Sequence, residues 1–184
     1  MPIFPKKGKV NYGGIEMSEQ KKYEFTGKIK TIFGIEFKQI RAIISFGCVV
    51  AGEIGGWIEC EENLSQSGDA WVSGNARVSG NARVSGNARV YGNAEVYGNA
   101  RVSGNAEVEN NNDYMVVGGA GRYDRLTTFF KCRDKTIKVI CGCFFGTIIE
   151  FRAKVKETHK GNKHEKVYLA MADMVELQLD DDDK

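Results

Sequence analysis

The most regular pattern of hydrophobic and polar positions in the chain is a six-residue repeat that runs from residue 67 to residue 108. The consecutive units read SGDAWV, three copies of SGNARV, YGNAEV, YGNARV and SGNAEV. Ala and Val lie two residues apart, so in an extended strand they share one face, while the Arg, Glu or Trp between them faces the other way. Gly and Asn tolerate the positive φ angles of a sharp bend. The repeat therefore predicts short strands joined by corners, with the Ala and Val side chains buried.

A strand of this length cannot bury its apolar face alone, so successive coils must stack on a shared core. We therefore predict a β-solenoid with coils about 4.8 Å apart. With three units per coil, residues eighteen positions apart lie above one another. These stacked pairs would join opposite charges, an aromatic ring and a cation, or two amides, and one pair would have like charges. The stacked pairs are Arg77–Glu95, Arg89–Glu107, Trp71–Arg89, Asn75–Asn93 and the like-charge pair Arg83–Arg101. Two units per coil would stack Arg77 on Arg89 instead, so we favour the triangular coil.

The unit V-S-G-N-A-R resembles the hexapeptide-repeat family at its aliphatic and small positions, although Ser or Tyr after Val departs from that family's usual second residue. The resemblance covers residues 67–108 and implies a left-handed β-helix. Many hexapeptide-repeat enzymes are acyltransferases with a histidine base. Here neither His159 nor His164 lies in the repeats, and the units make little more than two coils, so an acyltransferase is a less favoured alternative.

The flanks divide the chain into further segments. Residues 1–22 include both prolines and predict a flexible arm. Alternating apolar residues around a turn at Gly34 predict a β cap over residues 23–66, where Ile58 and Leu64 open the first coil irregularly. Residues 109–179 predict a ββαα lobe: strands at 127–132 and 136–141, then a helix that begins with the capping box of Thr147 and Glu150 and a helix over residues 164–179. Residues 180–184 form an acidic tail. The fold class is therefore mainly β, a short β-solenoid with an N-terminal β cap and a C-terminal ββαα lobe.

Composition limits the function classes. A hydrophobic content of 42% permits a packed core, and a net charge of +2 does not indicate a large nucleic-acid surface. The five cysteines are an odd number, and no apolar run reaches the length of a membrane span. These features predict a protein of a reducing cytoplasm that does not contact a membrane.

The cysteines and histidines suggest two kinds of chemistry. Cys132, Cys141, Cys143 and His159 are of the types that bind zinc, but their spacing matches no common zinc module. Cys141 and Cys143 would share one strand face by a period of two, which suits buried core thiols equally well. We therefore predict no cofactor and keep zinc as an alternative. Cys143 lies shortly before a predicted helix N-terminus, so a Cys143–His159 nucleophilic pair is a further hypothesis.

Basic residues gather in the C-terminal lobe and are interleaved with aromatic residues, as in some surfaces that bind nucleic acids or nucleotides. The patch comprises Arg122, Arg125, Lys131, Arg133 and Lys135. An ordinary solvated hairpin explains the same pattern, and we favour that interpretation.

The flanks also resemble those of a family of small phage and prophage proteins. The resemblance rests on stretches such as Gly52–Glu59 (GEIGGWIE), Thr127–Phe129 and Cys141–Phe144. It indicates an origin in phages of bacteria and not a chemistry. Small phage proteins of this kind commonly block host defence, and the repeats predict a rigid scaffold without a catalytic constellation. We therefore predict a non-enzymatic binding protein that inhibits a bacterial host defence component, such as a CRISPR nuclease, by binding the effector protein or nucleoprotein or by sequestering a nucleotide ligand. A self-assembling solenoid is a further alternative, because near-identical coils could pair through their edges, and we expect a homo-oligomer.

Overall fold

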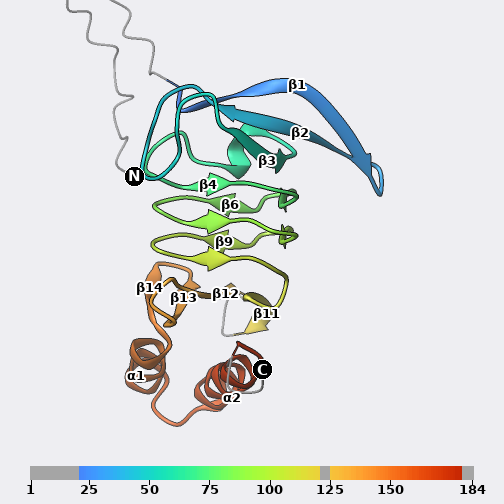
Figure 1. Cartoon of the computed structure of the whole chain (residues 1–184). Helices are drawn as coiled ribbons and strands as arrows, with labels where there is room; N and C mark the ends of the chain where they lie inside the picture. The colour runs from blue at the N-terminus through green and yellow to red at the C-terminus, as the bar shows by residue number, and fades with distance from the viewer. Residues whose placement is uncertain (1–20, 121–124, 180–184) are drawn as a thin grey trace, which may run out of the picture.

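The computed structural model describes residues 21–120 and 125–179. Three parts follow one another along the molecule: a β-hairpin cap, a stack of coils, and a lobe in which a sheet carries two helices (Figure 1). In chain order the elements are β1 (Tyr23–Ile32), β2 (Ile35–Ala42), β3 (Ile54–Ile58), the 3-10 helix η1 (Glu61–Asn63), β4 (Trp71–Val72), β5 (Arg77–Val78), β6 (Arg83–Val84), β7 (Arg89–Val90), β8 (Glu95–Val96), β9 (Arg101–Val102), β10 (Glu107–Val108), β11 (Tyr114–Ala120), β12 (Arg125–Lys131), β13 (Ile137–Cys141), β14 (Phe144–Thr147), α1 (Ile148–His159) and α2 (Lys163–Leu179).

The coils have the predicted triangular form. Parallel pairing joins β4 to β7 and β7 to β10 on one side, β5 to β8 on the second and β6 to β9 on the third. The paired residues are Trp71–Arg89, Arg89–Glu107, Arg77–Glu95 and Arg83–Arg101, as expected for an eighteen-residue coil. Every Ala and Val of the repeat is buried, so the inward face of each short strand forms the solenoid core.

The corners of the coils depend on the glycine and asparagine of each unit. Gly68 has φ +72°, and a Cβ atom there would lie 2.6 Å from the carbonyl oxygen of Gly86 in the next coil. A side chain at this corner would therefore be strained and would also clash. The Asn75 amide donates to the side-chain oxygen of Asn93 at 3.3 Å, and Asn81 donates to Asn99 at 3.0 Å, so amide ladders tie successive corners together.

The solenoid begins before the repeats do. Ile58 pairs with Val78 and Leu64 bridges to Val84, so the opening coil has a spacing of twenty residues instead of eighteen. The irregular opening predicted from Ile58 and Leu64 is confirmed, and Val72 completes this coil. The chain thus forms three coils between Ile58 and Val108, which corrects the smaller number inferred from the repeats alone.

The upper end is closed by the hairpin of β1 and β2, which continues through β3 into the β5–β8 face of the solenoid. Tyr23 and Ile40 of the hairpin and Trp71 of the first coil are buried where the cap meets the solenoid. Lys22 is also buried, with 2% of its surface exposed, so it belongs to the cap and not to the arm assigned to residues 1–22. Residues 1–20 of that arm and the acidic tail lie outside the described residues. Beyond the coil, the hairpin extends to one side of the molecule (Figure 1).

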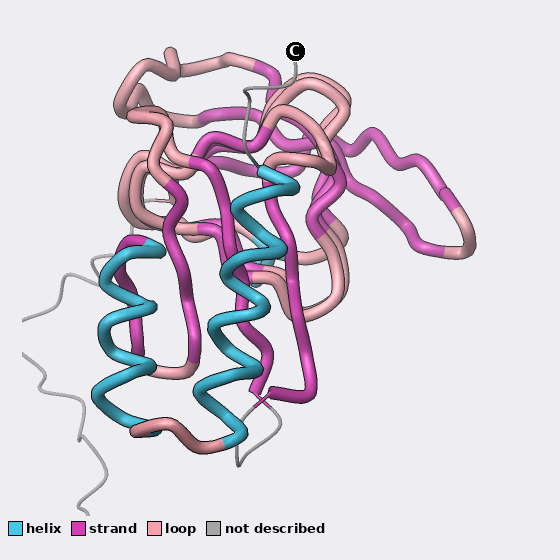
Figure 2. Tube along the Cα trace, turned by 90° about the horizontal axis from the view of Figure 1, so that it is seen from below, coloured by secondary structure: helices cyan, strands magenta, loops and turns pink. Residues whose placement is uncertain are grey.

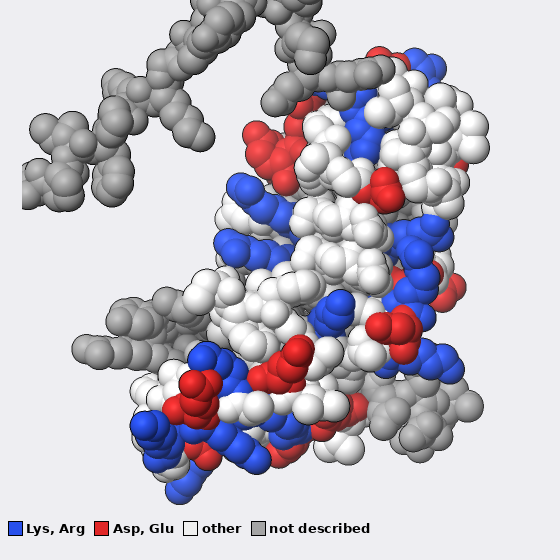
Figure 3. All heavy atoms as spheres, turned by 90° about the vertical axis from the view of Figure 1, so that its left-hand side faces the viewer, with Lys and Arg blue, Asp and Glu red and all other residues white. Residues whose placement is uncertain are grey.

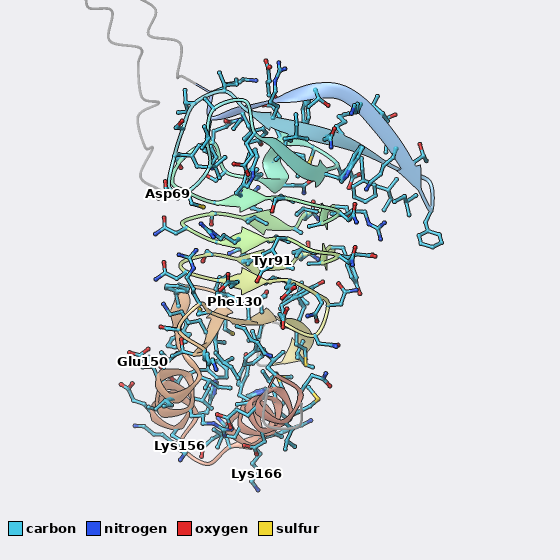
Figure 4. The ribbon with its side chains drawn as sticks, viewed as in Figure 1. Asp69, Tyr91, Phe130, Glu150, Lys156 and Lys166 are labelled. Carbon is cyan, nitrogen blue, oxygen red and sulfur yellow. The ribbon has the colours of Figure 1, made fainter. Side chains whose placement is uncertain are left out.

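The lower lobe contains more strands than the predicted ββαα. Strands β11, β12, β13 and β14 form an antiparallel sheet in that order, and α1 and α2 lie side by side across it (Figure 2). Phe130 of β12 packs against the last coil (Figure 4), whereas its neighbour Phe129 belongs to the core between the sheet and the two helices. The capping box at the start of α1 is confirmed: Thr147 accepts from the backbone N–H of Glu150, and the Glu150 carboxylate accepts from that of Thr147 at 2.7 Å.

Strand β14 was missed because Cys141-Gly142-Cys143 reads as the end of a continuous strand. Gly142 has φ +62°, and Cys141 pairs with Phe144 across the turn. Gly142 and Cys143 are therefore the two residues of a tight hairpin turn. Cys141 is half-buried in β13 and Cys143 is exposed in the turn, so the two thiols do not share a strand face as the period of two suggested.

Candidate binding surfaces

The first candidate surface is a groove beneath the projecting hairpin. It has a volume of about 220 Å³ and is lined on the hairpin side by Ile32, Phe33, Ile35 and Phe37 and on the solenoid side by Arg77, Ser79, Glu95 and Tyr97. Arg77 forms an ion pair with Glu95 on the groove wall and also lies over the ring of Phe37. The groove is therefore apolar on one side and charge-compensated on the other, which suits an uncharged or weakly charged partner surface.

Phe33 at the tip of the hairpin has an unusual position. Ile32 pairs with Ile35, which leaves Phe33 and Gly34 as a two-residue turn with φ +49° and +80°. Positive φ at both residues is typical of type I′ turns, where Asn-Gly is preferred and a bulky residue in the first position is strained. The Phe33 side chain is nevertheless 99% exposed. Phe33 therefore strains the backbone of the free protein, and burial of its ring does not offset that strain there.

A second cavity, of about 390 Å³, lies on the side formed by β4, β7 and β10. Arg89 contacts the Cys48 thiol across it, between Trp71 above and Glu107 below. Glu53 also lines this cavity. The arginine thus shares its cavity with two carboxylates, so the wall is polar with no excess of positive charge.

A third cavity, of about 340 Å³, lies where the β6–β9 side of the solenoid meets the C-terminal sheet. Its lining consists of Asn99, Arg101, Leu126, Thr128, Ile140 and Gly142. Thr128 is buried, and its hydroxyl oxygen accepts a hydrogen bond from the backbone N–H of Arg101 at 3.2 Å. Strands β12 and β13 bring the other wall residues together, since Thr128 pairs with Ile140.

The structure does not bring the predicted zinc ligands together. Cys132 is buried at the last coil, where it bridges to Ala106, whereas Cys143 is exposed in the β13–β14 turn. His159 stacks on Tyr168 with ring centroids 5.5 Å apart and lies 5.8 Å from His164, at the far end of α1. Within residues 21–120 and 125–179, no group of three or more His, Cys, Asp or Glu side chains is placed to hold a metal ion.

The Cys143–His159 pair is separated for the same reason. Strand β14 and the whole of α1 lie between the two residues, and a helix of twelve residues is about 18 Å long. Strand β14 also removes Cys143 from the N-terminus of α1, which was expected to activate the thiol. The geometry therefore offers no nucleophile–base contact between these residues.

The predicted basic patch is divided by the strands that carry it. Lys131 lies 3.6 Å from the Asp113 carboxylate, at the opposite end of β12 from Arg125, of which the structure describes the backbone. Arg133 joins the lobe to the last coil through its backbone N–H, which donates to Asn105 at 3.1 Å, and Lys135 lies in the following turn. Arg122 is outside the described residues. On the side shown in Figure 3, acidic and basic side chains are interspersed over the solenoid and the lobe.

Both ends of the solenoid are covered within the described residues. The Tyr23 hydroxyl donates to the carbonyl of Leu64 at 2.8 Å at the upper end, and the Tyr114 hydroxyl donates to that of Glu95 at 2.6 Å at the lower end. The backbone N–H of Glu109 donates a hydrogen bond to the Asp113 carboxylate. Side chains thus occupy some of the backbone groups through which coil edges of two chains would pair, and the homo-oligomer stays a prediction.

The fold defines a repeat β-solenoid protein with a β cap and a C-terminal lobe. A family model described as the YdcK β-solenoid repeat matches residues 70–86, 82–97 and 94–110, which is the part of the chain that forms the stacked coils. No curated protein matches the chain significantly. None of the described helices has the length and apolar character needed to cross a membrane.

Proposed function

We propose that this chain is a non-enzymatic binding protein whose projecting hairpin and the groove beneath it contact a bacterial host protein. The observation that carries the proposal is Phe33, a fully exposed aromatic side chain held at a positive φ angle on the tip of a paired hairpin. Backbone strain of this kind persists where another constraint retains the residue, and burial of the ring in a partner supplies one.

The surroundings of Phe33 support this proposal. Tyr97, on a solenoid corner across the groove, is 61% exposed, and Ile29 on the outer part of β1 is exposed as well. Exposed aromatic and aliphatic side chains that flank an apolar groove are typical of protein interfaces. The stacked coils hold the groove wall in place by backbone pairing, so little ordering would be needed on binding.

The partner class follows from the resemblance of the flanks to small phage and prophage proteins. We infer that the host protein is a defence component, such as a CRISPR nuclease or another immune effector, and that the chain inhibits it by occupying a surface. In this proposal the solenoid is a rigid spacer between the hairpin and the helical lobe, and it performs no chemistry.

The test compares the wild-type chain with Phe33→Asn in bacterial host lysate and in phage plating assays on cells with defined defence systems. The substitution suits the turn and removes the ring, so it should abolish capture of the partner and rescue of the phage. Leu177→Asn is the matched control, because Leu177 is also a largely exposed apolar residue, at 84%, on α2 at the other end of the molecule. Equal capture and rescue by the wild-type and Phe33→Asn chains would refute the proposal, as would a wild-type chain that protects phage from no system.

A further inference from the structure

Arg83 and Arg101 form a like-charge column on the β6–β9 side of the solenoid. They are paired in register, so their Cα atoms lie about 4.8 Å apart, and both side chains are exposed. Among the described residues neither guanidinium takes part in a hydrogen bond or an ion pair. Arg83 does act on the carboxylate of Glu62, but the pKa of Glu62 is lowered mainly by hydrogen bonds and only weakly by the charge of Arg83.

The other two outward columns are compensated. Arg77 is paired with Glu95, and Arg89 lies between Trp71 and Glu107. The three cavities show the same contrast. Each contains one arginine of the repeat, but carboxylates share the walls of the first two, whereas among the described residues Arg101 is the single charged one that lines the third. Within the described part of the chain, the positive charge at that cavity therefore has no carboxylate beside it in the wall.

The rest of the cavity wall is arranged in two zones. Asn99 lies beside Arg101, and because its side-chain oxygen already accepts from Asn81, its amide N–H groups are the part left to donate. The opposite zone is apolar and consists of Leu126 and Ile140 from neighbouring strands. A ligand that satisfies both zones needs an anionic group with a ring or other apolar group attached to it.

We propose that this cavity binds a nucleotide, with a phosphate held by Arg101 and Asn99 of the cavity wall and by Arg83 of the coil above, and with the base packed on Leu126 and Ile140. Guanidinium groups bind phosphate oxygens in a bidentate manner, and a phosphate between two stacked arginines removes their mutual repulsion. A volume of about 340 Å³ lies within the range of small-molecule sites. The site is on a different side of the solenoid from the Phe33 groove, so it does not depend on the proposed protein partner.

The test is calorimetric titration of the full chain at low salt with four ribonucleoside 5′-monophosphates, with inorganic phosphate and with the four nucleosides. At least one monophosphate should bind more tightly than both inorganic phosphate and its own nucleoside, since only the monophosphate fills both zones. Arg101→Ala should weaken that binding at least tenfold, and higher salt should weaken it further.

Arg89→Ala is the matched control, because it removes the equivalent arginine from a compensated column, and it should leave the affinity within about twofold. Leu126→Glu tests the apolar zone and should also abolish binding. Thermal unfolding of each variant checks that it is folded. The proposal is overturned if no monophosphate binds, if inorganic phosphate binds as tightly as the best nucleotide, or if folded Arg101→Ala binds as tightly as wild type.

Discussion

The Lys22 ammonium group donates a hydrogen bond to the backbone carbonyl of Ala70 at 2.8 Å, at the top corner of the first coil. It also donates to the carbonyl of Gly68 at 3.2 Å and lies over the ring of Phe46. In lower coils such carbonyls accept from the backbone of a neighbouring coil, but the first coil has none above it. A buried lysine therefore completes the backbone hydrogen bonding at an end of the solenoid, where an unpaired carbonyl would be costly.

The charge of Lys22 predicts a pH dependence of stability. Burial lowers the pKa of Lys22 from 10.5 to about 8, against a smaller opposing effect of Asp69. Between those values the unfolded chain binds more protons than the folded chain, so the free energy of unfolding should rise with pH. The neutral amine keeps two N–H donors for the two carbonyls. The rise should reach up to about 3 kcal/mol.

Urea unfolding of the wild-type chain and of Lys22→Met at several pH values from 7 to 10 checks this prediction. The wild-type advantage over the variant should grow with pH. Measurements stop at pH 10 because burial raises the pKa of the Tyr23 hydroxyl, so its ionisation in the unfolded chain would lower stability above that pH. If the difference in the free energy of unfolding between the two proteins does not change with pH, burial does not lower the pKa of Lys22 in the folded chain.

The corner glycines predict a graded effect of alanine. Gly68→Ala combines a positive φ with a Cβ only 2.6 Å from a backbone oxygen, so it should lower the free energy of unfolding by roughly 2–4 kcal/mol. Gly98 has φ +68°, but a Cβ there would meet nothing within 4 Å. Gly98→Ala isolates the backbone strain and should cost about 1 kcal/mol. Equal losses in urea unfolding would contradict the close packing of the coils at Gly68.

The register of the coils could be predicted from sequence because each unit repeats its Ala, Val and Gly at a constant phase. Once Arg77 and Glu95 are placed in one column, the eighteen-residue spacing follows from charge alone. The opening coil was harder to predict because the step from Leu64 to Val72 is longer than a repeat unit. Lys22 was missed because a lysine beside Lys21 reads as solvated, and its acceptors lie more than forty residues away.

Most features of the candidate surfaces could not be predicted from the sequence. A turn at Gly34 could be recognised, but the groove needs Phe33 opposite Tyr97, and only the pairing of β2 with β3 brings the hairpin there. Gly142 is typical of a turn, but the two flanking cysteines were interpreted as candidate zinc ligands. The uncompensated pair of Arg83 and Arg101 was visible in the repeat, whereas the apolar wall from Leu126 and Ile140 was not, because it belongs to another part of the chain.

The charge columns predict opposite effects of the same substitution on two sides of the solenoid. Arg83→Glu places a carboxylate over Arg101 and should raise the free energy of unfolding by about 0.2–1 kcal/mol, as exposed pairs do. Arg77→Glu replaces an attractive pair with Glu above Glu95 and should lower it by a similar amount. Both changes should shrink in 1 M NaCl, where the Debye length is about 3 Å. Changes of the same sign would mean that propensity or packing, and not charge, dominates these positions.

Replacement of Phe33 by asparagine should raise the stability of the fold and remove the proposed function. Asparagine adopts positive φ at the first position of a type I′ turn more readily than phenylalanine, so Phe33→Asn should raise the free energy of unfolding by about 1 kcal/mol. Phe33→Ala separates the two contributions: it removes the ring but keeps the strained backbone of a residue with a Cβ, and its stability should stay close to wild type because the exposed ring packs on little. Chemical denaturation of the three proteins gives the order. If Phe33→Asn is less stable than wild type, the ring stabilises the free hairpin, and the turn would no longer need a partner to explain its phenylalanine.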